Sequence, residues 1–470
     1  METEVMPLSA LWRRLFARPC ILGSVASVVP TVVFLGVYLP VVGHGFLSDD
    51  FRWVLNSRLE SLTDVARLFK LSDGFYRPIV SLTFGLDRLA FGINPRPYGW
   101  TNVGLSLITA LLIRKLALSF GLEKGSGVLA ASLWLLNFHG INLSLLWVCG
   151  RTALILAAAA TGCAICIVRR RLVWAMACLA LALFSKEEAF TLPFVLACWL
   201  YILGSGSPAA RALTVAKWLL LSGFVITAYL MLRSTTGAMT PATAPSYYQF
   251  TFAPVAVLRG ALQSADRAVT VSTTAALLGL LLLWPRGVRL DSARRRTVVC
   301  AGIWVVGGYG ITVFLPVRST LYSVVPSIGA CVGAATLLEV FWYAADAWHR
   351  RRALLAGILL PICLAPVYRS RTASVPLADF SSQVLRDIHE ETRDVPEGAT
   401  VVIVDDRRTR INIATGFGWL FNDAVLLTTG RRINMWIDPP VPGQEGYAPP
   451  CGSCVYKRLR VVEGRVVPFR

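Results

Sequence analysis

Two adjacent carboxylates, Asp49 and Asp50, stand in the stretch SDDF directly after an apolar run that covers residues 20–42. An ionisable group at the edge of hydrocarbon is energetically costly, so such a position is a candidate functional site. A carboxylate there can act as a general base toward a hydroxyl group. The pair therefore predicts acid–base chemistry at a membrane surface, and a divalent cation bound by Asp49 and Asp50 is the alternative.

Further charged side chains lie at or near the outer ends of other apolar runs. They are Arg77 in FYRP, Arg151 in VCGR, Lys186, Glu187 and Glu188 in FSKEE, and Arg318 in PVRST. A helix bundle would bring these groups to one depth on one side of the membrane. The competing interpretation is that each Arg or Lys extends to the interface or pairs with a carboxylate.

The composition indicates which kind of fold positions these charged groups. The chain has 470 residues, of which 55% are hydrophobic and 16% are charged. Its net charge of +19 comes from basic residues placed between apolar segments, which is not typical of a nucleic-acid-binding domain. We predict an all-α polytopic membrane protein with about eleven transmembrane helices. The predicted spans are 20–42, 99–119, 127–148, 152–168, 172–185, 188–203, 213–232, 268–285, 297–316, 320–343 and 353–368.

The basic residues are distributed unevenly between the two sides of the predicted bundle. One set of alternate connections, including residues 1–19, holds 19 Lys and Arg, whereas the short connections of the other set hold six. The positive-inside rule then makes residues 1–19 a cytoplasmic segment and places the C-terminus outside. Within residues 172–203, the charged triplet at Lys186 predicts either two short helices or a re-entrant hairpin.

The first outside loop, residues 44–98, contains a predicted helix over 78–93. Ile79, Leu82, Leu86 and Leu89 recur at helical spacing, and Asp87 falls off that face. This pattern predicts a helix lying along the membrane surface. The alternative is a twelfth, tilted span.

The composition becomes mixed after the last apolar run, and residues 369–470 predict a small extracytoplasmic α/β domain. The pattern of residues 377–395 is helical, GATVVIVDD reads as a buried strand, and VYKRLRVVEGRVVPF predicts two strands joined at Glu-Gly. Cys451 and Cys454 are candidates for a structural disulfide, with unpaired thiols and redox chemistry as the alternatives. A zinc site would need a second cysteine pair in the tail, which has none.

The order of the motifs resembles that of the membrane glycosyltransferases of the GT-C superfamily. The motifs are SDDF, FYRPIVSLTFGLD, GINPRPYGWTN, CGR, SKEE and RSTLYSVVPSIG, over about residues 20–345. Within that superfamily the chain is most similar to bacterial relatives of the protein O-mannosyltransferases and of the eukaryotic transmembrane O-mannosyltransferases that carry tetratricopeptide repeats. The resemblance implies a multi-pass protein of the bacterial inner membrane that transfers a sugar from a polyprenyl-phosphate donor.

The resemblance also implies roles for individual residues. An acidic residue early in the first outside loop is the proposed catalytic base of the family, which here is Asp49 or Asp50. The departing phosphate needs cations, and the candidates are Arg77, Arg151, Lys186 and Arg318. Supporting positions are Glu187, Tyr76, Asn102 and Tyr322. No cofactor is required, apart from the possible divalent ion, and direct displacement would invert the anomeric carbon.

Two other classes of protein remain open from the sequence. A transporter or lipid flippase would also have many spans, but it should show repeats and charges near the middle of the membrane. A scaffold without an active site is the third hypothesis. The chain also departs from the family, because Ser106 stands where many relatives have a histidine, and the acceptor (protein, glycan or lipid) stays open.

Overall fold

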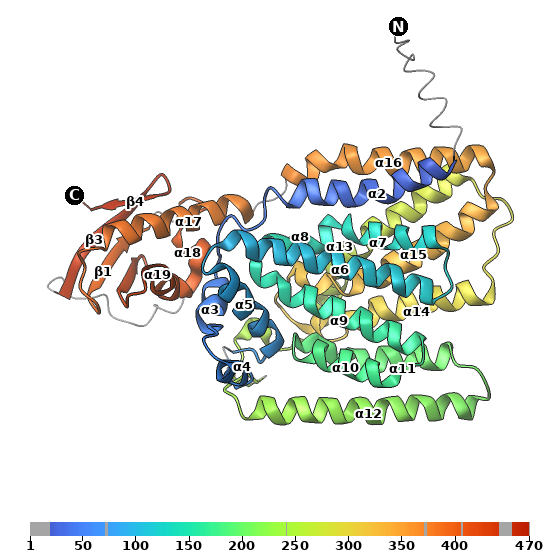
Figure 1. Ribbon diagram of the computed structural model, residues 1–470, viewed down its shortest axis with the longest axis horizontal. Helices are drawn as coiled ribbons and strands as arrows, with labels where there is room; N and C mark the ends of the chain where they lie inside the picture. Colours follow the sequence, from blue (N-terminus) through green and yellow to red (C-terminus); the bar gives the residue numbers. More distant parts are fainter. Residues whose placement is uncertain are drawn as a thin grey trace, which may run out of the picture.

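The computed structural model describes residues 19–70, 74–240, 242–370, 374–405, 408–440 and 454–469. Most helices run side by side in one bundle, and a small α/β domain lies at one end of it (Figure 1). The bundle helices are α2 (Pro19–Tyr38), α6 (Pro95–Ser119), α7 (Lys124–Leu135), α8 (Phe138–Leu146), α9 (Arg151–Val168), α10 (Leu172–Leu183), α11 (Leu192–Ile202), α12 (Pro208–Ser234), α13 (Pro254–Leu283), α14 (Ser292–Gly308), α15 (Pro326–Ala344) and α16 (Ala347–Ser370).

Local sequence explains where several of these helices begin. The side chains of Asn94, Ser207 and Asp291 accept hydrogen bonds from the first-turn amides of α6, α12 and α14. Such caps satisfy amides that have no partner inside the helix. Pro95 and Pro208 follow as first helical residues, where a missing N–H costs nothing.

Six of the described helices are long and apolar enough to cross a membrane, and a seventh candidate is the pair α7 and α8, bent by 62°. The six are α6, α12, α13, α16 and the segments Val148–Val168 and Thr320–Ala344, which add a short 3₁₀ turn to α9 and α15. Each of the eleven predicted spans coincides with a helix or a helix pair. The fold is therefore that of a multi-pass helical protein, and the count of eleven stays a prediction.

Burial distinguishes the centre of the bundle from its lipid-facing surface. The central 18 residues of the α9 and α15 segments are 78% and 72% buried, against 17% for α12 and none for α16. Large apolar side chains on α16, such as Leu359 and Ile362, are exposed. An exposed apolar face of this extent is what a bilayer would cover.

The region 172–203 forms two short helices, α10 and α11, joined by the 3₁₀ helix η2 (Glu187–Thr191). They have 12 and 11 residues. At about 1.5 Å per residue, each is much shorter than the roughly 30 Å hydrocarbon layer. The charged triplet at Lys186 therefore ends α10 and keeps the chain at one end of the bundle.

The first outside loop folds into α3 (Asp50–Asn56), α4 (Leu62–Leu68) and α5 (Pro78–Phe91). The predicted helix of this loop is confirmed, because α5 covers 14 residues. Leu86 and Leu89 are exposed, whereas Asp87 is buried toward the bundle. The helix is not among the candidate spans, which favours a position along the surface.

The C-terminal domain contains the predicted helix as α17 (Ser374–Glu391) and the predicted strands as β1 (Thr400–Val404), β3 (Val455–Val462) and β4 (Arg465–Pro468). It adds α18 (Ile413–Phe417), α19 (Phe421–Thr429) and β2 (Asn434–Asp438), which the sequence analysis did not predict. The sheet order is β2-β1-β3-β4; β1 pairs in parallel with β2 and β3, and β4 pairs antiparallel with β3. Val401 and Ile403 of β1 are fully buried, as expected of a central strand.

Candidate active site

The acidic pair lies where the first outside loop meets the C-terminal domain. Ser48, the residue before the pair, has φ of 46° and its amide donates to the carbonyl of Gly416, at 3.0 Å. The left-handed backbone turns the chain sharply into α3. Asp49 consequently caps α3 as a partly exposed residue, and Asp50 is its first residue and is fully buried.

Both carboxylate oxygens of Asp50 accept backbone hydrogen bonds. One accepts from the amide of Leu47, at 2.9 Å, and the other from the amide of Cys149, at 2.7 Å. Burial raises the pKa of Asp50 from 3.8 to about 7, and these hydrogen bonds only partly offset it. Asp50 thus joins the first loop to the 3₁₀ helix η1 (Val148–Gly150). A reacting hydroxyl group could reach the Asp50 carboxylate only if one of the two backbone hydrogen bonds opened.

The raised pKa of Asp50 predicts a pH-dependent stability. The native state holds this proton more tightly than the unfolded chain, so its stabilising contribution falls as pH rises from 3.8 to about 7. For one group the slope is roughly 1.4 kcal/mol per pH unit. We expect the free energy of unfolding to decrease across this range, and the Asp50→Asn variant to lack that slope. Equal slopes in both proteins, measured by reversible unfolding in mixed micelles, would contradict the assignment.

Asn102 holds η1 in place from the neighbouring helix α6. Its side-chain amide donates to the carbonyls of Ser144, Trp147 and Val148, at 3.1 to 3.2 Å. The residue is fully buried. Its function is therefore to fix the turn whose Cys149 amide binds Asp50, and the hydroxyl of Ser106 in turn donates to the Asn102 carbonyl, at 3.0 Å.

A second group of charges surrounds Glu187 at the start of η2. Arg77 donates to one oxygen of Glu187 through two nitrogens, at 2.7 and 3.0 Å, and Arg233 contacts the other oxygen at 3.3 Å. Burial alone would raise the pKa of Glu187, but the ion pair with Arg77 outweighs it and lowers the pKa. Glu187 is accordingly ionised and holds two cations in place.

Lys186, the residue before Glu187, pairs with a different carboxylate. Its ammonium lies 2.9 Å from Glu188 and 4.9 Å from the centre of the Tyr322 ring. Burial lowers the pKa of Lys186, and Glu188 only partly offsets this effect. The carboxylate and the ring, from different elements, thus fix a buried cation.

Tyr248, in the 3₁₀ helix η3 (Ser246–Tyr248), connects the acidic pair with the charges around Glu187. Its ring packs edge-on against Phe75, with centres 5.4 Å apart. Burial raises the pKa of Tyr248; Arg77 lowers it, and Asp49 raises it. The carboxylate of Asp49 and the guanidinium of Arg77 therefore both lie near this phenol.

The sequence prediction named Glu188 among the charged candidates but missed Tyr248 and Arg233 as site residues. Tyr248 belongs to a polar loop after α12 that carries no familiar motif. Arg233 ends α12 and resembles any basic residue at a span terminus. The only signal was that each lies on the side of the bundle predicted to be outside.

Arg151 is placed differently from the other predicted phosphate-binding cations. Its side chain is fully buried, donates to Asp87 at 2.6 Å and to the carbonyl of Tyr98 at 3.1 Å, and lies over the Phe84 ring. Nε and Nη1 of the Arg151 guanidinium are buried without a hydrogen-bond partner among the described residues. We interpret Arg151 as a residue that attaches α5 to α9 through Asp87, and its role in phosphate binding stays a prediction.

Arg318 remains available as a cation. Its guanidinium donates to the carbonyls of Ala256, at 3.0 Å, and of Leu315, and none of the described carboxylates pairs with it. Its neighbour Val317 donates to the carbonyl of Tyr247, at 3.2 Å. Arg318 therefore lies beside η3, the same element that carries Tyr248.

The remaining predictions concern Tyr76, a metal ion and the cysteines. Tyr76 is fully buried against Phe184 and Tyr229, which places it in the packing beneath the site. Among the described residues, no group of three or more His, Cys, Asp and Glu side chains is arranged to hold a metal ion. Cys454 is disulfide-bonded, whereas Cys451 lies outside the described residues.

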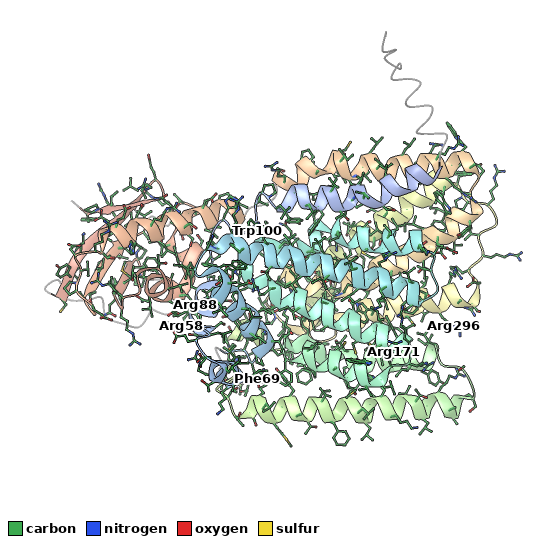
Figure 2. The ribbon with its side chains drawn as sticks, in the orientation of Figure 1. Arg58, Phe69, Arg88, Trp100, Arg171 and Arg296 are labelled. Carbon is green, nitrogen blue, oxygen red and sulfur yellow. The ribbon has the colours of Figure 1, made fainter. Side chains whose placement is uncertain are left out.

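The C-terminal domain packs directly on the loop that carries the acidic pair. Phe51 stacks on Phe417 with ring centres 5.4 Å apart, and Arg52 pairs with Asp423 at 2.8 Å. In Figure 2, Arg58 and Arg88 mark this junction between the bundle and the C-terminal domain. The domain therefore fixes the position of α3.

No protein-family model matches the chain, and no curated protein matches it. Its fold is similar to that of the Archaeoglobus fulgidus oligosaccharyltransferase. The structure of that enzyme tethered to an acceptor peptide with the NVT sequon gives a TM-score of 0.50 at 10% identity, over 90% of this chain and 64% of that chain. The apo form gives 0.47 at 10% identity, over 92% and 66%. The chain spans less than two thirds of that enzyme, and at 10% identity the similarity is one of fold alone.

Proposed function

We propose that this protein is a membrane glycosyltransferase that moves a sugar from a polyprenyl-phosphate donor to an acceptor hydroxyl. The observation that carries the proposal is the arrangement of one partly exposed carboxylate, Asp49, at the same end of the bundle as the Tyr248 phenol and the cations Arg77, Lys186 and Arg318. These groups lie at the end of a bundle whose fold is similar to that of an oligosaccharyltransferase. By the positive-inside rule, this end faces the outside of the bacterial inner membrane.

Asp49 is the base in this proposal. It is partly exposed at the start of α3, whereas Asp50 is buried with both oxygens bound to backbone amides. The acceptor oxygen attacks the anomeric carbon, its proton passes to Asp49, and the bond from that carbon to the phosphate oxygen breaks. The polyprenyl phosphate leaves with the electron pair, and the configuration inverts.

The leaving phosphate needs positive charge more than it needs a proton. Arg318 is the favoured ligand because its guanidinium is held only by backbone carbonyls. Lys186 and Arg77 add positive potential from positions fixed by Glu188 and Glu187. The donor lipid would lie along the exposed apolar helices.

The test uses purified protein in liposomes with a panel of radiolabelled polyprenyl-phosphate sugars. We expect one donor to be consumed with formation of polyprenyl phosphate, at a rate proportional to the folded protein. If no donor of the panel is bound or consumed, the proposal fails, and the transporter and scaffold hypotheses gain support.

A further inference from the structure

Two adjoining cavities lie at the other end of the bundle, away from the candidate site. One, of about 210 Å³, lies between α6, α9, α11 and α14. The second, of about 300 Å³, lies between the turn that joins α9 to α10, the first residue of α10, the end of α11 and the start of α12. Arg170 and Leu200 line both. Figure 2 shows Arg296, which lines the first cavity, and the nearby Arg171 toward the end opposite the C-terminal domain.

The polar part of the lining is basic. Arg170, Arg211 and Arg296 line the cavities, and no Asp or Glu among the described residues does. The guanidinium groups of Arg170 and Arg296 donate to the carbonyls of Leu203 and Ser292. Neither pairs with a carboxylate in the part of the chain that the structure describes.

Two further observations indicate a ligand. The Nε of Arg211 is buried without a hydrogen-bond partner among the described residues, although its guanidinium lies 5.0 Å from the centre of the Tyr201 ring. Asp291, which caps α14, and Glu339 of α15 both pair with Arg294, and neither pairs with Arg296. A buried donor without a partner is costly, and an anion would remove that cost.

The apolar part of the lining distinguishes a lipid from a free anion. Phe120, Trp199, Leu200 and Leu203 line the cavities beside the arginines. These residues lie at or just beyond the ends of the apolar helices α6 and α11. Basic pockets between helices on the cytoplasmic side suit the phosphate of an anionic lipid.

We propose that these adjoining cavities bind the phosphate headgroup of an anionic phospholipid on the face predicted to be cytoplasmic. Arg170, Arg211 and Arg296 hold the phosphate, and the apolar residues contact the first part of the acyl chains. The site is separate from the proposed transfer site and does not depend on the transferase activity. A headgroup bound in this site would hold together the ends of α9, α11, α12 and α14.

The experiment places the full chain in nanodiscs of phosphatidylcholine mixed with phosphatidylglycerol. Native mass spectrometry then measures how much phosphatidylglycerol the protein retains. The test variant is the double substitution Arg211→Gln and Arg296→Gln. The matched control is Arg351→Gln with Arg352→Gln, because these exposed arginines begin α16 at the same end of the bundle and do not line the cavities. We expect the test variant to retain on the order of tenfold less phosphatidylglycerol, and the control to retain as much as the unmodified protein.

Equal retention by the test variant and the unmodified protein would overturn the proposal, and so would an equal loss in the control. The single variant Arg296→Gln, at an exposed position, provides the same comparison if the double variant does not fold. A further arm adds inorganic phosphate to discs of phosphatidylcholine alone. Thermal stabilisation by phosphate as large as that by phosphatidylglycerol would assign the cavities to a free anion and overturn the lipid assignment.

Discussion

Substitution of Asp49 by Asn is expected to lower the turnover of sugar transfer by about 10²- to 10⁴-fold, the usual contribution of a general base. The amide cannot accept the acceptor's proton, although it keeps the size of the side chain and its place at the start of α3. Donor binding should change little, because the proposed phosphate contacts come from other residues. The measurement is the rate of polyprenyl-phosphate formation in liposomes at saturating donor, together with donor affinity.

The control for this prediction is Glu60→Gln, which removes a carboxylate from the same loop. Glu60 is exposed and pairs with Arg58 on the surface. We expect its turnover to equal that of the unmodified protein. Full activity of Asp49→Asn, or an equal loss in both variants, would rule out Asp49 as the base.

The second large effect is expected on stability. Arg151→Met should lower the free energy of unfolding by about 3–5 kcal/mol, because it leaves a buried carboxylate without its partner. The partner is Asp87, at 2.6 Å, and the arginine side chain is fully buried. The measurement is reversible unfolding in mixed micelles, or thermal unfolding where unfolding is irreversible.

A double variant separates loss of the ion pair from loss of packing. Arg151→Met combined with Asp87→Leu removes both charges, and such replacements are often neutral or stabilising. We expect it to be more stable than the single variant. If the single variant unfolds within about 0.5 kcal/mol of the unmodified protein, Arg151 has no structural role of this kind.

Much of the fold was predictable because the signals were local. Apolar runs locate the bundle helices, although the break between α7 and α8 was not predicted, and the apolar segments of the tail give β1, β3 and β4. The lengths of α10 and α11 were harder to define, since Lys186 interrupts one nearly continuous apolar stretch. Whether each short helix crosses a bilayer depends on its neighbours more than on its own sequence.

The candidate site was predictable in its residue types but not in its pairings. The sequence shows that Asp49 and Asp50 are adjacent, but it cannot show that η1 supplies an amide to Asp50 across 99 residues. Similarly, Arg77 and Arg151 look equivalent at the ends of apolar runs. Their partners, Glu187 and Asp87, are set by tertiary packing, and that difference separates a residue beside the site from a structural one.

The most direct test of the account is the ratio of turnover by Asp50→Asn to turnover by Asp49→Asn, each measured in liposomes and normalised to folded protein. The account predicts a ratio well above one, because Asp49 takes the proton and Asp50 only supports the loop. A ratio of one or below would contradict it and would make Asp50 the base or leave both carboxylates outside the reaction.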